Sequence, residues 1–224
     1  MRLKCLGSGS SGNCYLLESD QETLVIEAGL PFMEVKKALN FNIQKIVGVI
    51  IGHSHGDHSK HAADYEKVGI PVFKPYEFEM LRQVRTYGDF VIKSFDVVHD
   101  VPCCGFLIAH PEMGRFLYAS DTEYIKYRFD RLNHILVEAN YSANLIDPDA
   151  VNRFHVLTGH MELQTTLGFL QENLCPELRN VILCHLSEKN ADPEQFQKET
   201  ERIVDCEVYV AERGLEVDLS FVPF

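Results

Sequence analysis

Three histidines and one aspartate lie within six consecutive residues, His53-Ser54-His55-Gly56-Asp57-His58. Side chains of these types would repel and desolvate one another if they were buried together without a cation, so the spacing predicts a metal site. A chance cluster on a solvated surface and a remnant of a purification tag are the alternatives. Tags lie at chain termini, whereas this stretch follows an apolar run and precedes a helical pattern. We therefore interpret it as a metal-ligating loop.

This metal-ligating loop begins where a buried strand is expected to end. Residues 46–51 form a continuous apolar run of strand length, and Asp57 lies in the acidic first turn of a helix start. Other reactive side chains also follow strand-like runs, namely Glu27, His99, Asp121, Glu138 and His185, while His160 precedes a helical pattern. This recurrence at strand ends favours one shared site. For Glu27 we expect a role in orienting a neighbouring loop rather than direct ligation.

The rest of the chain alternates between strand and helix patterns. Strands are expected at residues 2–6, 13–18, 24–26, 46–51, 71–73, 89–99, 104–109, 115–120, 134–137 and 180–184, and a closing strand pair at 206–210 and 215–219. Helices are expected at residues 31–39, 76–86, 142–154, 162–173 and 193–204. The Gly/Ser-rich residues 7–13 predict a turn rather than a phosphate-binding P-loop, because no lysine and no helix start follow. His110 is expected in a solvated turn.

The composition fits a globular α/β protein. A length of 224 residues with 46% hydrophobic residues allows a sizeable core, and residues 1–224 are expected to form a single domain because no repeat or linker interrupts them. Neither an apolar run of membrane-spanning length nor an export leader is evident, which predicts a cytoplasmic protein. The seven cysteines show no CxxC pairing and indicate reduced core thiols. For Cys103-Cys104, packing is favoured over a redox or ligand role.

The net charge of −12 disfavours a broad basic face for nucleic acid. An acidic chain can nevertheless bind a phosphate substrate. Bound divalent cations would reverse the field locally while the chain as a whole stays negative.

The loop motif resembles the HxHxDH signature of the metallo-β-lactamase superfamily. With Ser8-Gly9-Ser10-Ser11-Gly12-Asn13-Cys14, Ile26-Glu27-Ala28-Gly29, Ser120-Asp121-Thr122 and His185-Leu186-Ser187, it looks like the YycJ/WalJ branch, which is similar to ribonuclease Z. The resemblance spans nearly the whole chain. It implies an α/β (α+β) fold, the four-layer αββα metallo-β-lactamase sandwich, with the metal site at one edge of two facing sheets.

The resemblance also implies two divalent metal ions, Zn²⁺ or Mn²⁺. His53, His55 and His99 would hold the first ion, Asp57, His58 and His185 the second, and Asp121 would bridge both. Such a pair can generate and aim a hydroxide at a phosphodiester without a protein nucleophile. Asp57 is also expected to orient the water.

The ribonuclease Z pattern further assigns His160, backed by Glu138, as the acid that protonates the leaving group; the alternative is that His160 only supports the site. The chain departs from the pattern at Glu27, where Asp is usual, and at Glu123, where Gly is usual. It also lacks the long arm with which ribonuclease Z grips transfer RNA, which disfavours tRNA processing.

Together these features predict a dinuclear metal-dependent phosphodiesterase that acts on nucleic-acid ends or on a nucleotide-like diester. One alternative is a hydrolase of carboxylic esters, lactones or thioesters on the same metals. Another is a non-catalytic regulatory module that the metals stabilise. The expected partner is the nucleic acid or nucleotide-like substrate, with no membrane; the sequence indicates no particular oligomeric state.

Overall fold

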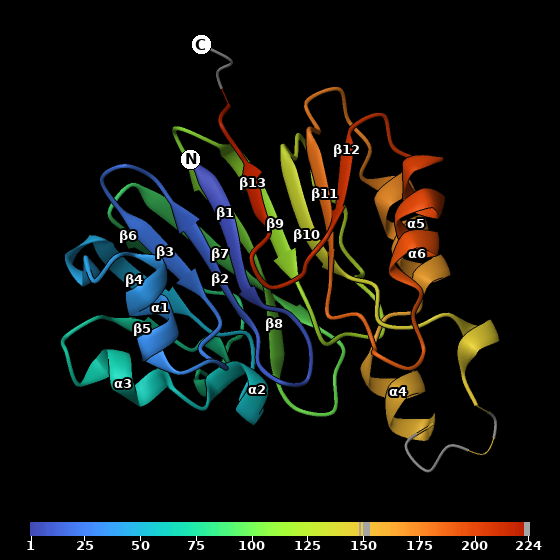
Figure 1. The fold of residues 1–224 in the computed structure, drawn as a ribbon, viewed down its shortest axis with the longest axis horizontal. Helices are drawn as coiled ribbons and strands as arrows, with labels where there is room; N and C mark the ends of the chain where they lie inside the picture. The colour runs from blue at the N-terminus through green and yellow to red at the C-terminus, as the bar shows by residue number, and fades with distance from the viewer. Residues whose placement is uncertain (148, 150–152, 222–224) are drawn as a thin grey trace.

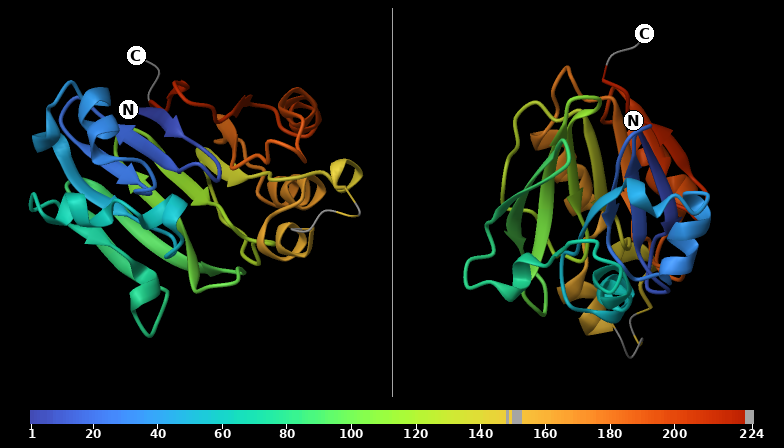
Figure 2. Two further views of the ribbon diagram at one scale, coloured as in Figure 1. Left: turned by 60° about the horizontal axis from the view of Figure 1, so that its bottom comes forward. Right: turned by 90° about the vertical axis from the view of Figure 1, so that its left-hand side faces the viewer.

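The structure is a computed structural model that describes residues 1–147, 149 and 153–221. Two β-sheets face each other, and helices lie on their outer sides (Figures 1 and 2). Sheet A has the strand order β13-β1-β2-β3-β4-β5, and sheet B has the order β12-β11-β10-β9-β8-β7-β6. The chain therefore has the mixed α/β architecture with two facing sheets that the sequence predicted.

Sheet A is built from the first third of the chain and one late strand. Its members are β1 (Arg2–Gly7), β2 (Cys14–Glu18), β3 (Thr23–Ile26), β4 (Ile46–Ile50), β5 (Val72–Phe73) and β13 (Glu216–Asp218). The pairs β13–β1, β1–β2 and β2–β3 are antiparallel, whereas β3–β4 and β4–β5 are parallel. The carboxyl ends of β3 and β4 consequently meet at one edge of the sandwich.

Sheet B changes from antiparallel to parallel pairing along its width. Its members are β6 (Val84–Tyr87), β7 (Phe90–Val97), β8 (Cys103–His110), β9 (Gly114–Ala119), β10 (His134–Glu138), β11 (Asn180–Cys184) and β12 (Glu207–Val210). Pairing is antiparallel from β6 to β9 and parallel from β9 to β12. The parallel strands β9, β10 and β11 end at the same edge as β3 and β4.

Short helices connect the strands. They are α1 (Phe32–Ala38), α2 (Gly56–Ser59), α3 (Ala62–Glu66), α4 (Arg153–Gly159), α5 (Leu163–Glu172) and α6 (Pro193–Glu201), with 3-10 turns η1 (Ile43–Lys45), η2 (Pro75–Glu77) and η3 (Ala143–Leu145). The α6 start is typical: the Asp192 side chain accepts a bond from Gln195 N at 3.1 Å, and proline occupies the first turn. Among the described residues, no helix has the length and apolarity needed to cross a membrane.

The apolar core forms three layers, as two sheets covered by helices require. One cluster lies between the sheets and includes Ile26, Phe106 and Ile182. The other two lie outside sheet B, around Leu170, and outside sheet A, around Val35. All seven cysteines are free thiols, and Cys103 and Cys104 are packed in β8, in agreement with a structural role.

Two predicted helices are wrong. Residues 76–86 contain only the end of η2 and then the start of β6, which pairs with β7 across a tight turn. That turn needs Gly88, whose φ is +54° and whose Cβ would lie 1.6 Å from a Glu22 carboxylate oxygen. Of residues 142–154, the described part holds only η3 and the start of α4, while residues 148 and 150–152 lie outside the described residues.

Two further expectations fail at the far end of the sandwich. The closing strands do not pair with each other, because β12 joins β11 in sheet B and β13 joins β1 in sheet A. His110 is buried rather than solvated, and its Nε2 donates to Glu22 Oε1 at 2.9 Å. Both depend on contacts between segments that are distant in the sequence.

Candidate metal centre

All seven side chains predicted as metal ligands converge at the edge of the sandwich near α2. Figure 1 shows α2 at that edge. Their donor atoms form three overlapping groups, each with members within 4.8 Å of one another: His53, His55 and His99; Asp57, His58 and His185; and His53, His58 and Asp121. The first two groups match the two triads that the resemblance implied. Asp121 belongs to the third group, with one histidine from each triad.

Three residues enter this edge with left-handed backbone. Glu27, Asp121 and His185 have φ values of 63°, 52° and 54°. Each follows a strand and turns sharply there, and such conformations cost about 1–3 kcal/mol in a residue other than glycine. The surrounding structure fixes them: Glu27 N donates to Ile50 O at 2.9 Å, and His185 N donates to Ser8 Oγ at 2.9 Å.

The first triad offers imidazole nitrogens that its hydrogen bonds leave available. His99 Nδ1 donates to Gly159 O at 2.9 Å, which leaves the Nε2 lone pair directed towards His55 Nδ1, 3.4 Å away. His53 Nε2 is buried and has no hydrogen-bond partner among the described residues. Burial is the main cause that lowers the pKa of His53 to about 2, and the charge of the neighbouring His58 is the second. These atoms are suited to donate lone pairs to a metal ion.

The second triad combines imidazoles with buried carboxylates. Asp121 Oδ2 lies 2.8 Å from His58 Nε2, and Asp57 Oδ2 lies 3.6 Å from His185 Nε2. Although burial alone would lower it, the charge of Asp121 raises the pKa of His185 to about 10. The two carboxylates therefore require positive charge at this position. A divalent cation supplies it, and a mixed imidazole and carboxylate set suits Zn²⁺ or Mn²⁺.

Glu27 supports the loop, as expected, from the base of the site. Its Oε1 accepts a bond from Gly52 N at 3.1 Å, and its Oε2 lies 3.4 Å from His58 Nδ1. Sequence reasoning missed two asparagines with similar tasks. Asn13 Nδ2 lies 2.8 Å from His58 Nε2, and Asn140 Nδ2 donates to His185 O at 2.7 Å. Both lie within or beside the motifs, but no local pattern indicated their distant partners.

His160 lies between α4 and α5 next to the ligand cluster. Its Nδ1 donates to Glu138 Oε1 at 2.7 Å and is 3.4 Å from Asp121 Oδ1. Burial alone would lower the pKa of His160, but the Glu138 carboxylate raises it above the ordinary value. A hollow of about 310 Å³ opens beside His160 and is also lined by residues 8–11 and 185–189.

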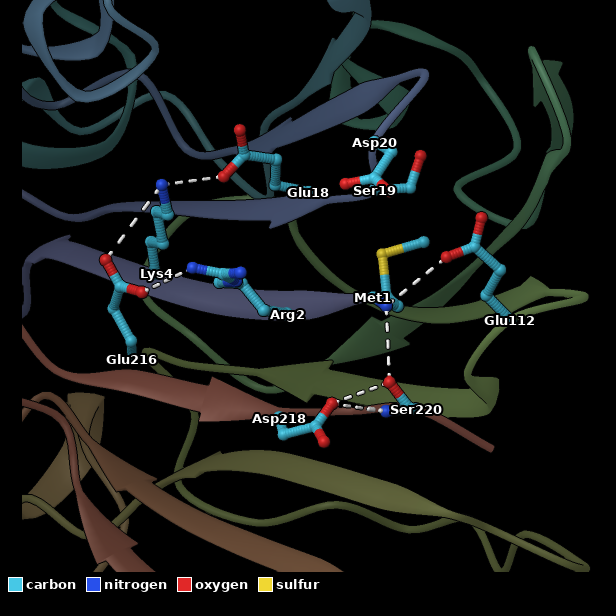
Figure 3. Close-up of a pocket in the computed structure, with 10 residues that line it drawn as sticks. All are labelled: Met1, Arg2, Lys4, Glu18, Ser19, Asp20, Glu112, Glu216, Asp218 and Ser220. Atoms are coloured by element: carbon cyan, nitrogen blue, oxygen red, sulfur yellow. Dashed lines mark hydrogen bonds and ion pairs between the residues drawn. The ribbon is translucent and has the colours of Figure 1, made fainter. Parts of the chain in front are cut away.

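A second hollow, of about 550 Å³, lies at the opposite end of the strands (Figure 3). Its charges pair among themselves: Lys4 Nζ lies 2.7 Å from Glu18 Oε2, and Arg2 donates to Glu216 at 3.0 Å. Its lining contains no histidine. The chemistry-bearing groups therefore gather at the α2 edge.

Comparisons with known proteins place the chain near metallo-β-lactamase sequences. Residues 7–77 match the model of the Metallo-beta-lactamase superfamily. The chain is 23% identical to exodeoxyribonuclease YycJ of Bacillus anthracis, across 99% of this chain and 93% of that protein. It is 24% identical to exodeoxyribonuclease WalJ of Streptococcus pneumoniae, across 83% of this chain and 81% of that protein.

Solved structures show the same fold. The metallo-β-lactamase fold protein YhfI from Bacillus subtilis superposes with a TM-score of 0.74 at 19% identity, over 96% of this chain and 98% of that one. Human tRNase Z, short form, has a TM-score of 0.65 at 14% identity, over 98% and 99% of the two chains. Fold and site together define the chain as a metal-dependent hydrolase of the metallo-β-lactamase fold. Within that class its sequence resembles the YycJ/WalJ branch.

Proposed function

We propose that the chain is a dinuclear phosphodiesterase that hydrolyses nucleic-acid ends. The proposal assigns Zn²⁺ or Mn²⁺ to two sites, one held by His53, His55 and His99, the other by Asp57, His58 and His185, with Asp121 between them. The donor types and their convergence support this assignment. The names of the sequence relatives, both exodeoxyribonucleases, support a nucleic-acid substrate.

When bound, two such ions supply Lewis-acid polarisation of the phosphoryl group and an activated water. The chain's own residues then orient the attacking water and protonate the leaving group. Asp57 is only partly buried, and its carboxylate accepts a hydrogen bond from the attacking water. His160, whose Nδ1 faces Glu138, donates the Nε2 proton to the leaving alkoxide.

The single observation that carries the proposal is the 2.7 Å contact between His160 Nδ1 and Glu138 Oε1 beside the metal cluster. An alkoxide leaving group is a strong base and needs a proton, so a positioned acid serves diester hydrolysis. A purely structural metal site has no use for such a pair. Glu138 is also fixed by Thr122 N at 3.0 Å and Met161 N at 3.3 Å, which holds it in place for this role.

The test is a substrate panel for the metal-loaded protein: end-labelled single- and double-stranded DNA, a bis-aryl phosphate, lactones and thioesters. We expect DNA to be shortened from an end, and Asp57→Ala to abolish most of the activity. His160→Ala should lower DNA turnover by about 10²–10⁴-fold. The same substitution should affect the bis-aryl phosphate much less, since an aryl oxide such as nitrophenolate is a weak base and leaves without a proton.

The matched control is His61→Ala, which removes a histidine that pairs with Asp64 outside the cluster and should leave turnover intact. Full diesterase activity in excess chelator would contradict the proposal. Ester or thioester turnover that is faster by orders of magnitude, with His160→Ala nearly neutral, would favour a carboxylic ester hydrolase instead.

A further inference from the structure

Residues 123–130 connect two parallel strands, β9 and β10. Because both strands end at the metal edge, this connection must run back from that edge towards the other end of sheet B. It has no regular secondary structure, but its exposure alternates strictly. An inner row, Ile125, Tyr127 and Phe129, is half-buried, whereas an outer row is exposed: Tyr124, Lys126, Arg128 and Asp130. Alternation with period two indicates extended chain lying on a surface.

The inner row anchors this segment to the outer face of sheet B. The Phe129 ring centroid lies 4.9 Å from that of Phe95 and 6.4 Å from that of Phe169. The Tyr127 ring lies 5.7 Å from that of Phe95. At its start, Glu123 N donates to Val98 O at 3.0 Å, next to the ligand His99. These contacts hold the segment against sheet B, and its first residue lies beside the metal cluster.

The outer row carries an aromatic ring and two cations, and it ends at the acidic Asp130. Tyr124 is 46% exposed, as is the Lys126 side chain, and the Arg82 guanidinium lies 5.1 Å from the Tyr127 ring. Asp96 pairs with both Lys126 and Arg82. Arg128 makes no ion pair within the described part of the chain. Three cations, Lys126, Arg128 and Arg82, thus face two carboxylates, Asp96 and Asp130, which leaves one net positive charge here in a chain whose net charge is −12.

The spacing of the outer row suits a polynucleotide backbone. Alternate residues of extended chain lie roughly 6.6 Å apart, comparable to the phosphate separation in an extended single strand. Cations in a row neutralise successive phosphates, and exposed aromatic rings stack on unpaired bases. The acidic remainder of the chain disfavours binding elsewhere.

We propose that Tyr124, Lys126 and Arg128, together with Arg82, form a track that binds a single nucleic-acid strand leading away from the metal centre. The cations contact phosphates, and Tyr124 stacks on a base near the scissile bond. This inference rests on the proposed function, because it extends the substrate of the same site. It places the uncleaved part of the strand along the outer face of sheet B.

The test compares the double variant Lys126→Gln/Arg128→Gln with Lys37→Gln/Lys67→Gln. The control residues Lys37, in α1, and Lys67, which follows the last residue of α3, are 60% and 72% exposed. Their substitution removes the same amount of charge at another place on the surface. In the wild type, KM should fall as the single strand is lengthened from a dinucleotide to an octanucleotide. For the octanucleotide, the KM of the track variant should be about tenfold higher than that of the wild type, whereas the control variant should keep the wild-type KM.

Salt dependence gives a second readout. The slope of log KM against log salt should shrink by about 0.7 for each phosphate that the track variant no longer neutralises. Tyr124→Ala should raise KM without changing this slope, because stacking releases no counterion. Anisotropy of a labelled oligonucleotide on the Asp57→Ala protein should show the same ranking without turnover.

The outcomes separate the two proposals. If the wild type cleaves the strand but the track variant keeps its length gain and salt slope, the track is overturned and the proposed function stands. If the wild type does not cleave nucleic acid, the proposed function fails, and equal anisotropy for track and control variants then overturns the track as well. An equal loss for a duplex of the same length would overturn the single-strand assignment.

Discussion

Glu138 connects the proposed acid to the metal centre at the residue scale. Its carboxylate accepts from His160 Nδ1 at 2.7 Å and lies 3.3 Å from His185 Nδ1. It is completely buried, so its charge acts on both imidazoles with little screening. One carboxylate thus sets the tautomer of the proposed acid and supports a ligand of the proposed second metal position.

Glu138→Gln tests this arrangement through pH. The Glu138 charge raises the pKa of His160 against the effect of burial, so His160 stays protonated to a higher pH than an ordinary histidine. A general acid works below its pKa and fails as the pH rises through it. Removing the charge lowers that pKa, and the alkaline loss of kcat should therefore begin at a lower pH.

The measurement is the pH profile of kcat on an oligonucleotide for Glu138→Gln beside Glu162→Gln. Glu162 lies just before α5. Its side chain accepts a hydrogen bond from Ala143 N in a loop at 3.4 Å, away from the histidine cluster, so its variant should keep the wild-type profile. An unshifted alkaline limb in Glu138→Gln would remove His160 from the acid role.

At the scale of elements, the metal-ligating loop is held by backbone contacts with the turn after β3 and with the residue before β2. Ala28 N donates to His58 O at 2.7 Å, and Asn13 N donates to Asp57 O at 2.7 Å. A Cβ on Gly29 would lie 1.7 Å from Asp57 O. The close approach of these segments requires glycine, and it places the Asp57 and His58 side chains.

Gly29→Ala should therefore destabilise the protein by about 1–3 kcal/mol and weaken metal binding, because the clash is with backbone that cannot rotate away. Gly168→Ala in α5 is the matched control. Its added Cβ would meet nothing within 4 Å, and alanine should stabilise that helix by about 0.5–1 kcal/mol. Urea unfolding and metal content of both variants check this. Wild-type stability and metal content in Gly29→Ala would contradict it.

Local patterns predicted the elements around the site better than their long-range partners. The strand before His53 and the turns at Asp121 and His185 are recognisable because an apolar run ends in polar residues. The short spacing between β12 and β13 suggested a hairpin, yet each pairs with a strand of a different sheet. The Asn13–His58 contact likewise joins residues 45 positions apart, and no local period can indicate it.

For the molecule as a whole, the site exists only when both sheets are packed together. Sheet A and its loops contribute Glu27 and the 53–58 stretch, while sheet B contributes His99, Asp121 and His185. We propose on this basis that residues 1–224 fold as one domain and that metal binding stabilises the closed sandwich. Metal at 100 times its Kd would add about 2.7 kcal/mol to the free energy of unfolding.

The most direct measurement is a titration of metal-depleted protein with Zn²⁺ or Mn²⁺, in which bound metal, Tm and diesterase activity are followed together. The account predicts about two ions per chain, a rising Tm in one unfolding transition, and activity that appears with the metal. Asp57→Ala should bind less metal and stay inactive. Full diesterase activity with excess chelator would contradict the account. So would a protein that binds no metal even at the highest metal concentration of the titration.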